Sequence, residues 1–369
     1  MRLQHITACM IMAISLTALG ESINEPIREP TDAGSRELAR HARKGFSHQQ
    51  RVLKLVEQHL DQAAAAGFSG SVLIALDGQK LLVKGYGKAR PAIGTPNRGS
   101  TAFDFGSVMK DVTAAAIFKL AGEGRLSVGD SITRFFDDMP ADKQNITILH
   151  LLKHRAGLET YHDTTGDFEA ITRLESRRRI FSQKLKFKPG TDEAYSNSGY
   201  TLLADIIATA SGQQFDDYIR QEIYAPARMT ESGFYGDPVW NYINTAVGYG
   251  ASTFGNNDPT NWPLTWALVG NGGLVTTVSD LDRWVSAIAT GKVLRGRALA
   301  GYRKHILEAG IMTYKGKTVY VAAGGGDFGF AGVLVDCPQQ GARIIIGTNS
   351  DVSYDIEALA YEIGDRILF

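Results

Sequence analysis

The sequence holds 369 residues with a formal net charge of +0, of which 44% are hydrophobic and 21% are charged. This balance indicates a globular protein and gives no electrostatic reason to expect a nucleic acid or an acidic surface as partner. A chain of this length buries a substantial core, in one large domain or in two sub-domains.

The first twenty residues are typical of an export signal. Basic residues precede an apolar run from Ile6 to Leu19, and small residues stand where a signal peptidase would cut. The run is too short and poorly flanked for a stable membrane span. We therefore expect residues 1–20 to be a signal peptide cleaved near Gly20, with an uncleaved amphipathic anchor as the alternative. The mature chain would then have no transmembrane segment and would be periplasmic or secreted.

The two cysteines bear on the same question. Cleavage near Gly20 would remove Cys9 and leave Cys337 as a single thiol. An exported protein with one thiol has no intramolecular disulfide and depends on its core for stability. We interpret Cys337 as a small buried hydrophobic residue and not as a catalytic group.

The elements after the signal follow from composition and periodicity. Residues 21–45 are charged, contain proline and lack a period, which predicts a linker. Apolar spacing predicts a helix over 47–66, and Asp77-Gly78 between two β-rich runs predicts a hairpin. Its strands are expected at 70–76 and 80–87. Later helices are expected at 146–153, 168–185, 200–211, 215–223 and 354–368, and strands at 317–323, 329–336 and 342–348.

Strands therefore gather at the two ends of the chain around a mostly helical middle. This order predicts an α+β fold in a domain that spans residues 46–369. Segments of about 46–104 and 300–369 would share one antiparallel sheet flanked by helices. Residues of about 105–299 would form an inserted, mostly helical sub-domain.

One Ser-x-x-Lys stands in the sequence, at Ser107 and Lys110, and an Ala-rich helical run follows it. Gly106 suits a tight entry into that helix. Ser107 would lie on the first turn, where backbone N–H groups are unpaired, and Lys110 on the same face. A serine needs a base before it attacks a carbonyl, and a lysine serves only if burial keeps it neutral. The alternative is an ordinary capped helix with a lysine facing solvent.

A second stretch, Tyr195-Ser196-Asn197, follows a Pro-Gly turn and precedes a helix. A tyrosine on a tight loop passes a proton if a cation lowers its pKa. An asparagine can hold both a lysine and a substrate amide. The alternative is an aromatic loop anchor. Because Tyr242-Ile243-Asn244 repeats the pattern, only the surroundings favour the first copy.

A third stretch, Gly324-Gly325-Gly326, ends a predicted strand directly after Ala323. Three glycines let a second backbone or a substrate lie close against that strand. Gly324 to Gly329 also fits a dinucleotide fingerprint, and Asp327-Phe328-Gly329 a kinase signature. Both are coincidental, because a strand follows where the fingerprint needs a helix and no other kinase motif accompanies the second.

Taken together these stretches resemble the serine β-lactamase-like hydrolases, from about Phe68 to the C-terminus. That group includes class C β-lactamases, D-alanyl-D-alanine carboxypeptidases, and related esterases and D-aminopeptidases. The matching stretches occur in the order of the family. They are Phe68 to Leu73, Gly106 to Lys110, His150 to Leu158, Pro189-Gly190-Thr191, Tyr195 to Tyr200, Asn271 to Leu274 with Ser279-Asp280-Leu281, and Gly324 to Phe330. The resemblance implies an active site between the sheet and helical sub-domains.

The resemblance also implies roles. Ser107 would form an acyl-enzyme, Lys110 and Tyr195 would move its proton, and Asn197 would orient them. The N–H groups of Ser107 and Gly326 would form the oxyanion hole, beside a substrate-binding strand from Ala323 through Gly324 and Gly325. No metal or cofactor is needed, and the expected ligand is a small-molecule or peptide substrate.

One departure from the family concerns Ala323, because the family usually has Lys or His there. That cation helps to bind a substrate carboxylate, and a hydrogen bond to a charged group contributes ~1.5–3 kcal/mol. We therefore expect an exported serine hydrolase that acts on an ester or amide, with weak β-lactamase activity at most. The alternative is a catalytically weakened homologue that binds a cell-wall peptide or another ligand without turnover.

Three further features received a structural interpretation or stayed open. His150 and His154 have a spacing that can bind zinc, but without an H-E-x-x-H pattern we interpret them as structural. The run of arginines at 177–179 is interpreted as a solvated helix face. Trp262 and Trp266 stand in a polar and aromatic segment that either lines the active site or packs as a surface loop.

Overall fold

The computed structural model describes residues 32–238, 240, 245–249, 257–308, 311–325, 328–350 and 354–368. Its helices are α1 (Asp32–Ala65), α2 (Met109–Gly122), α3 (Ile148–Leu152), α4 (Arg173–Ser182), α5 (Asn197–Ser211), α6 (Phe215–Ile219), α7 (Ala225–Ala227), α8 (Val278–Ala289), α9 (Gly296–Tyr302) and α10 (Ile356–Leu368). Its strands are β1 (Gly70–Leu76), β2 (Gln79–Tyr86), β3 (Lys88–Arg90), β4 (Thr95–Pro96), β5 (Phe103–Asp104), β6 (Val275–Thr276), β7 (Ile311–Tyr314), β8 (Lys317–Gly325), β9 (Ala331–Cys337) and β10 (Ala342–Thr348).

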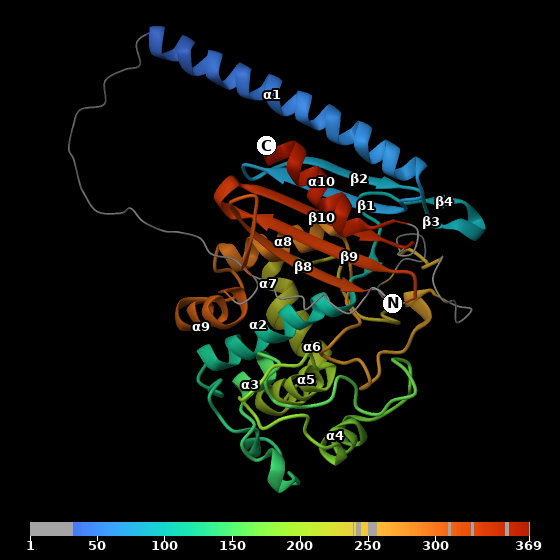
Figure 1. Ribbon diagram of the computed structural model, residues 1–369, viewed down its shortest axis with the longest axis vertical. Coiled ribbons are helices and arrows are strands. Elements are labelled where there is room, and N and C mark those ends of the chain that lie inside the picture. Colours follow the sequence, from blue (N-terminus) through green and yellow to red (C-terminus); the bar gives the residue numbers. More distant parts are fainter. Residues whose placement is uncertain are drawn as a thin grey trace, which may run out of the picture.

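The main sheet joins segments from both ends of the sequence. Its strands run antiparallel in the order β2-β1-β10-β9-β8-β7, so that β1 lies between its hairpin partner and β10 (Figure 1). The register pairs Gly70 with Thr348 and Leu76 with Ala342. The predicted α+β class, with one antiparallel sheet built from distant segments, is confirmed.

The predicted hairpin between β1 and β2 has the expected turn. Asp77 and Gly78 both have positive φ, at 51° and 74°. This pair of left-handed residues is typical of the turn whose twist matches that of the flanking strands. β1 and β10 have the predicted bounds, and β2 and β9 begin or end within two residues of them.

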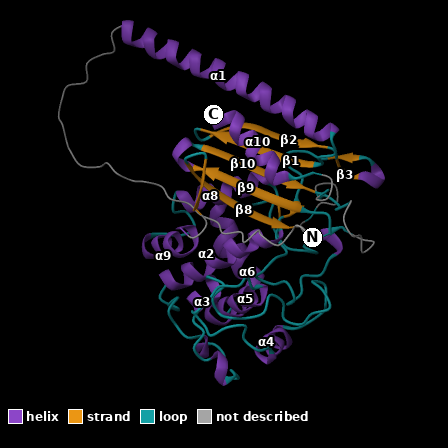
Figure 2. Ribbon diagram, viewed as in Figure 1, coloured by secondary structure: helices purple, strands orange, loops and turns teal. Residues whose placement is uncertain are grey.

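Helices cover the two faces of this sheet (Figure 2). Alternate residues of β1 face opposite sides, as strand geometry requires. Val72 and Ile74 pack in a cluster with side chains of α1 and α10, whereas Leu73 belongs to the core shared with the helical elements. α8 packs against β1 and β10. There Arg343 of β10 forms an ion pair with Asp282 of α8 at 2.6 Å.

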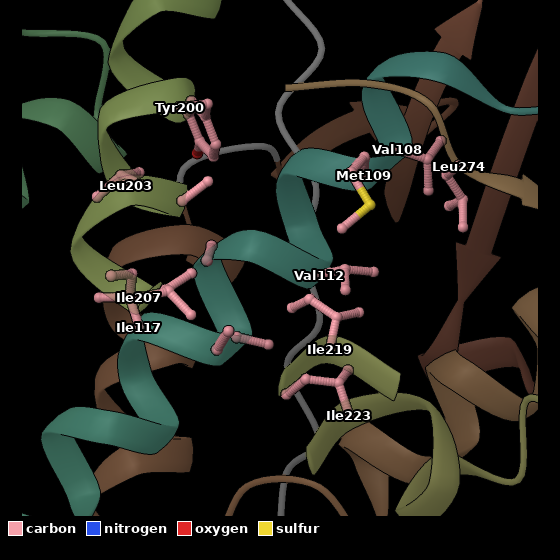
Figure 3. Close-up of a cluster of buried hydrophobic side chains, with 14 of the residues drawn as sticks. Val108, Met109, Val112, Ile117, Tyr200, Leu203, Ile207, Ile219, Ile223 and Leu274 are labelled. Atoms are coloured by element: carbon pink, nitrogen blue, oxygen red, sulfur yellow. The ribbon is translucent and has the colours of Figure 1, made fainter. Parts of the chain in front are cut away.

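The Ala-rich helix α2 lies at the centre of the molecule. It packs against α5 and α9, and nearly all its side chains are buried. Small alanines allow close approach of neighbouring helices. Ile117 lies beside Ile207 of α5, and Val112 lies next to Ile219 and Ile223 on another side of α2 (Figure 3). This burial on every side holds the N-terminal end of α2, and the Ser-x-x-Lys with it, in a rigid setting.

Several elements differ from the sequence-based expectation. α1 begins at Asp32 and not near residue 47, because the segment after Asp32 is rich in Ala and Arg, which favour helix despite the charge. α4 is shorter than the predicted helix over 168–185, since Thr172 caps it by accepting a hydrogen bond from the Glu175 N–H. The sequence analysis did not identify α8, α9 or β7.

Candidate active site

The turn that carries Ser107 is fixed by the residues before it. Gly106–Val108 form a single 3₁₀ turn that leads into α2, and Gly106 has a φ of 45°, which favours glycine. Asp104 accepts a hydrogen bond from the Gly106 N–H at 2.8 Å, and the Phe105 N–H donates to the Leu274 carbonyl at 2.9 Å. Ser107 therefore enters the helix from a tightly bonded corner.

The turn before α2 packs against a row of glycines on the sheet. Gly324 of β8, Gly332 of β9 and Gly347 of β10 are register partners on neighbouring strands. A Cβ on Gly332 would lie 2.2 Å from the Phe105 ring, and one on Gly324 would lie 2.2 Å from the Phe105 carbonyl oxygen. Only glycine at these positions leaves room for Phe105 against the sheet, so the row sets how close Ser107 comes to β8.

The two groups predicted to activate Ser107 both reach its hydroxyl. The Ser107 Oγ lies 2.8 Å from the Tyr195 hydroxyl, and Lys110 Nζ donates to the Ser107 Oγ at 3.0 Å. Lys110 Nζ also donates to the Asn271 carbonyl at 2.6 Å. The structure therefore brings Ser107, Lys110 and Tyr195 together, although 88 positions separate Ser107 from Tyr195.

Tyr195 is held by its neighbours on both sides. Its carbonyl accepts a hydrogen bond from the Thr160 hydroxyl at 3.2 Å. The next residue, Ser196, caps α5 by accepting from the Gly199 N–H at 3.0 Å. The ring of Tyr195 lies 4.7 Å from the ring of His154 between centroids, and His154 Nδ1 accepts the Ser196 N–H at 3.1 Å.

Lys110 lies in a buried and largely aromatic environment. Its Nζ is 4.9 Å from the Tyr195 ring centroid and 5.8 Å from that of Tyr200. Burial, with a smaller contribution from Lys110, lowers the pKa of His154 to about 3, so His154 is neutral at physiological pH. Burial also raises the pKa of Asp111 to about 8, although the positive charge of Lys110 opposes this shift.

His154 makes stability depend on pH in a defined direction. Its pKa of about 3 in the folded protein lies below the ordinary value of 6.5, so the unfolded chain binds this proton first as pH falls. The stabilisation is present above about pH 6.5 and is lost between pH 6.5 and 3. We expect the free energy of unfolding, measured with urea, to fall less from pH 7 to pH 5 in His154→Asn than in the wild type.

Asparagine is the suitable replacement for this test. His154 has a φ of 54°, which Asn tolerates better than most residues, and the Asn side-chain oxygen can accept the Ser196 N–H. An equal pH dependence in the variant and the wild type would contradict the assignment of this acid sensitivity to His154.

The structure describes the other predicted site residues only in part. Asn197 lines the cavity beside Ser107, but its Oδ1 is buried and has no hydrogen-bond partner among the described residues. The orientation of Lys110 by this oxygen, as the resemblance implied, is therefore not seen. Ala323, Gly324 and Gly325 lie on β8, paired with β9. Gly326 and the second Tyr-x-Asn copy at Tyr242 lie outside the described residues.

A cavity of about 30 Å³ opens beside Ser107. Polar side chains predominate in its lining, and the described lining residues include two carboxylates and no Lys or Arg. They are Asp104, Gly106, Ser107, Tyr161, Asp167, Asn197, Tyr235, Leu268, Asn271, Gly272 and Gly273. An ester or amide that enters this cavity would therefore meet hydrogen-bonding groups next to the Ser107 hydroxyl.

The two histidines with zinc-like spacing have structural roles in the described chain. His150 Nδ1 accepts the Thr147 N–H in a capping box at the start of α3. His154 Nδ1 is occupied by Ser196, as described above. Burial raises the pKa of the Cys337 thiol to about 11, which disfavours a reactive thiolate.

The contacts of the arginine run and of the two tryptophans show how these side chains are packed. Arg178 and Arg179 both form ion pairs with Glu175, one helical turn away on α4. Their guanidinium groups are therefore paired within the helix. Trp262 is 5% exposed and packs among other aromatic rings. Trp266 is partly buried, with the Arg173 guanidinium 5.7 Å from its ring centroid.

Sequence reasoning did not single out several residues that shape the site. Asp104 holds the Gly106 N–H and accepts from the Tyr235 hydroxyl at 2.8 Å. Asn271 supplies the carbonyl that binds Lys110, and its own side chain donates to the Thr201 hydroxyl at 2.8 Å. The only available signal for Asn271 was its place in a family-like stretch, and Asp104 had none.

The fold and the contacts of Ser107 with Lys110 and Tyr195 are those that the resemblance implied, and comparison with known proteins identifies the family. A family model described as Beta-lactamase matches residues 52–350. The match covers most of the chain, and the protein belongs to the β-lactamase family.

Its relatives include proteins named for cell-wall chemistry. The putative penicillin-binding protein PbpX of Bacillus subtilis is 29% identical over 306 residues, which cover 82% of this chain and 75% of PbpX. The D-alanyl-D-alanine-carboxypeptidase/endopeptidase AmpH of Escherichia coli K12 is 24% identical over 66% of this chain. The aligned part spans 64% of AmpH, slightly less than two thirds of its length.

Solved structures share the fold at lower sequence identity. The D-amino acid amidase from Ochrobactrum anthropi is 22% identical, with a TM-score of 0.70 over 87% of this chain and 97% of the amidase. The octameric penicillin-binding protein homologue from Pyrococcus abyssi is 23% identical, with a TM-score of 0.70 over 83% of this chain and 75% of that protein.

Proposed function

We propose that this protein is a serine hydrolase that acts on an ester or amide through an acyl-enzyme on Ser107. The observation that carries the proposal is the double contact of the Ser107 hydroxyl, with Lys110 at 3.0 Å and with Tyr195 at 2.8 Å. A nucleophile within hydrogen-bond reach of its base is the arrangement that covalent catalysis requires. The β-lactamase family membership supports the same reaction class.

In the proposed reaction, the Ser107 Oγ bonds to the substrate carbonyl carbon while the Lys110 and Tyr195 pair takes its proton. Collapse of the tetrahedral intermediate breaks the bond to the leaving group, which receives that proton. Water then attacks the acyl-enzyme by the reverse route and frees Ser107. The Asn271 carbonyl fixes Lys110 Nζ against the serine throughout.

An oxyanion hole completes the proposal. The Ser107 N–H lies in the first turn leading into α2, where backbone N–H groups have no intrahelical acceptor. The second donor expected from the resemblance, the Gly326 N–H, lies outside the described residues. Each such donor is worth about 3–4 kcal/mol of transition-state stabilisation.

The substrate is proposed to lack a carboxylate near the scissile bond. Ala323 stands where the family usually has a cation, and the described lining of the Ser107 cavity carries Asp104 and Asp167 without a Lys or Arg. A substrate carboxylate would be desolvated there without a positive partner, which is costly. Esterase or peptidase-like activity on neutral substrates is therefore favoured over efficient β-lactam hydrolysis.

Restoring the cation tests this preference. We expect Ala323→Lys to shift the ratio of kcat/KM values toward carboxylate-bearing substrates by about ten- to a hundredfold, since a hydrogen bond to a charged group is worth ~1.5–3 kcal/mol. The measurement compares a cephalosporin with p-nitrophenyl acetate. Ala323→Met adds length without charge and serves as the control. Efficient cephalosporin turnover by the wild type, unchanged in Ala323→Lys, would refute this interpretation of Ala323.

A second candidate function is a binding protein that has lost turnover, and Ala323 is the feature that favours it. The retention of Ser107, Lys110 and Tyr195 in mutual contact argues against it, because a pure binder needs none of these contacts. Intact mass spectrometry after exposure to a fluorophosphonate and, separately, to a penicillin distinguishes the two. A covalent fluorophosphonate adduct on Ser107 with hydrolysis of p-nitrophenyl acetate supports the hydrolase. A ligand that binds without adduct or hydrolysis supports the binder.

We also propose that the protein works outside the cytoplasm, in the periplasm or as a secreted enzyme. The support for this is the export-type sequence of residues 1–20, which lie outside the described part of the chain. Among the described residues, no helix is both long and apolar enough to pass through a membrane.

A further inference from the structure

The net charge of zero hides an uneven distribution of charge along the chain. Residues 36–54 contain six Lys or Arg and one Glu, so the rest of the chain carries a matching excess of acidic residues. This basic segment lies in the N-terminal part of α1, and the first turns of that helix extend beyond the sheet (Figure 1). We call its six cationic positions the basic stripe. They are Arg36, Arg40, Arg43, Lys44, Arg51 and Lys54.

Helix geometry places the basic stripe along one side of α1. Each residue turns an α-helix by about 100°, so the six positions fall within about a third of its circumference. The buried positions Val52, Val56 and Leu60 lie on the opposite side, where they pack in the cluster shared with the sheet and α10. The stripe therefore faces away from the domain and runs along the helix for about 27 Å, at a rise of about 1.5 Å per residue.

The described end of the stripe is open to solvent. Arg51 and Lys54 are exposed, and no described carboxylate forms an ion pair with either of them. The acidic residues that follow on α1 differ in this respect, because Glu57 and Asp61 lie 3.8 Å and 3.6 Å from Lys84 Nζ of β2. The charges of Arg51 and Lys54 are thus available to a partner outside the chain.

An extended anionic surface matches the stripe better than a small anion does. A row of cations about 27 Å long exceeds the reach of one phosphate or carboxylate group. Leu55, next to Lys54, is 55% exposed, so an apolar side chain flanks the cations, a combination found in helices that lie in a bilayer interface. The apolar run from Ile6 to Leu19 ends twelve residues before α1 begins, and insertion of that run would hold this end of the helix next to a bilayer.

We propose that α1 docks this protein on the surface of a lipid bilayer with anionic headgroups, with the basic stripe against the lipid phosphates and Leu55 at the interface. The attraction acts within a screening length of about 10 Å at 0.1 M ionic strength. The proposal concerns attachment and not the reaction at Ser107, so it is independent of the proposed function. It also differs from insertion of residues 1–20, because it assigns the binding to headgroup charge.

Sedimentation of the full 369-residue chain with vesicles tests the proposal. Vesicles of phosphatidylcholine alone measure any binding by the apolar run of residues 6–19, and an equimolar mixture with phosphatidylglycerol adds anionic headgroups. We expect the partition coefficient for the mixed vesicles to exceed that for the neutral vesicles at least about a hundredfold in 0.1 M salt. This excess should disappear in 1 M salt, where the screening length falls to about 3 Å. Equal binding to the two kinds of vesicle, or an excess that 1 M salt leaves unchanged, would overturn the proposal.

Neutralisation of the stripe tests the role of α1 itself. The stripe variant replaces four cations by Gln, which favours helix almost as well, and should lower the excess binding at least about tenfold. The matched control neutralises four exposed cations around α9, so that both variants have the same net charge. The stripe variant carries Arg36→Gln, Arg40→Gln, Arg43→Gln and Lys44→Gln, and the control carries Lys292→Gln, Arg295→Gln, Arg297→Gln and Lys304→Gln. An unchanged excess in the stripe variant, or an equal loss in the control, would contradict the assignment to α1.

Two other occupants of the stripe are distinguished by the wild-type protein. Binding to a DNA duplex that is tighter than binding to the mixed vesicles would indicate a nucleic acid. Salt-sensitive self-association in sedimentation velocity, without binding to the mixed vesicles, would indicate the acidic surface of a second copy. Either result would overturn the assignment of the stripe to a bilayer.

Discussion

Ser107→Ala is expected to abolish hydrolysis of p-nitrophenyl acetate, with a loss in kcat/KM on the order of 10⁶, and to abolish covalent labelling by a fluorophosphonate. The physical reason is that Ser107 Oγ is the one hydroxyl placed between Lys110 Nζ and the Tyr195 hydroxyl in the described chain. Removal of a nucleophile eliminates the covalent route and leaves only binding and electrostatic effects. Intact mass spectrometry and peptide mapping would locate the label in the wild type.

A buried serine that does not contact Lys110 provides the control for this experiment. Ser198 is fully buried on α5, and its hydroxyl lies 3.5 Å from His162 Nδ1, away from Lys110. Ser198→Ala should retain both labelling and hydrolysis when each is expressed per folded molecule. Labelling at a serine other than Ser107, or undiminished turnover in Ser107→Ala, would remove the basis of the proposed mechanism.

Lys110→Ala and Tyr195→Phe are each expected to lower the acylation rate by about 10²–10⁴, the usual range for general acid–base catalysis. Each substitution removes one of the two groups that contact the Ser107 hydroxyl. The double variant should lose less than the product of the two single effects, because both groups serve one proton path. Stopped-flow measurement of p-nitrophenol release in the first turnover gives the acylation rate.

Two other tyrosines test whether the correct one was chosen. Tyr200 also faces Lys110, but its hydroxyl donates to the Leu152 carbonyl at 3.0 Å, so Tyr200→Phe should change acylation little. Tyr242 belongs to the second Tyr-x-Asn copy. An inactive Tyr242→Phe beside a nearly normal Tyr195→Phe would mean that the wrong copy was assigned.

The parts of the site that lie close in sequence were readable from it. Ser107 and Lys110 are three residues apart at the start of one helix, so helical geometry alone places them on one face. Tyr195 lies 88 positions away, and no local rule connects it to Ser107. Its assignment required the resemblance to a family. His154 was noted only for its spacing from His150 and for its place in a family-like stretch, and Asp104 was not marked at all. The contacts of His154 with Tyr195 and of Asp104 with Tyr235 form only through tertiary packing.

The fold shows the same division between local and distant information. The β1–β2 hairpin followed from Asp77-Gly78, and the antiparallel sheet from the strands at both ends of the chain. α8 was missed although its signal was present, since Thr277 caps it and accepts the Asp280 N–H at 3.1 Å. The row of glycines under Phe105 was only partly predictable. Gly324 was noted at the end of its strand, but Gly332 and Gly347 align with it only once the register of three strands is known.

The pairing of β1 with β10 also has a consequence for the order in which the molecule folds. The Thr348 hydroxyl donates to the Ser69 carbonyl across 279 positions of sequence, so this central part of the sheet forms only after a very long loop has closed. Contacts of such separation are slow to form, whereas helix packing such as that of α2 on α5 uses nearer segments. The row of glycines under Phe105 lies on β8, β9 and β10. A partly folded chain can therefore possess Ser107, Lys110 and Tyr195 and still lack the support under Phe105, so we expect the proposed hydrolytic activity to appear only after the C-terminal strands have docked.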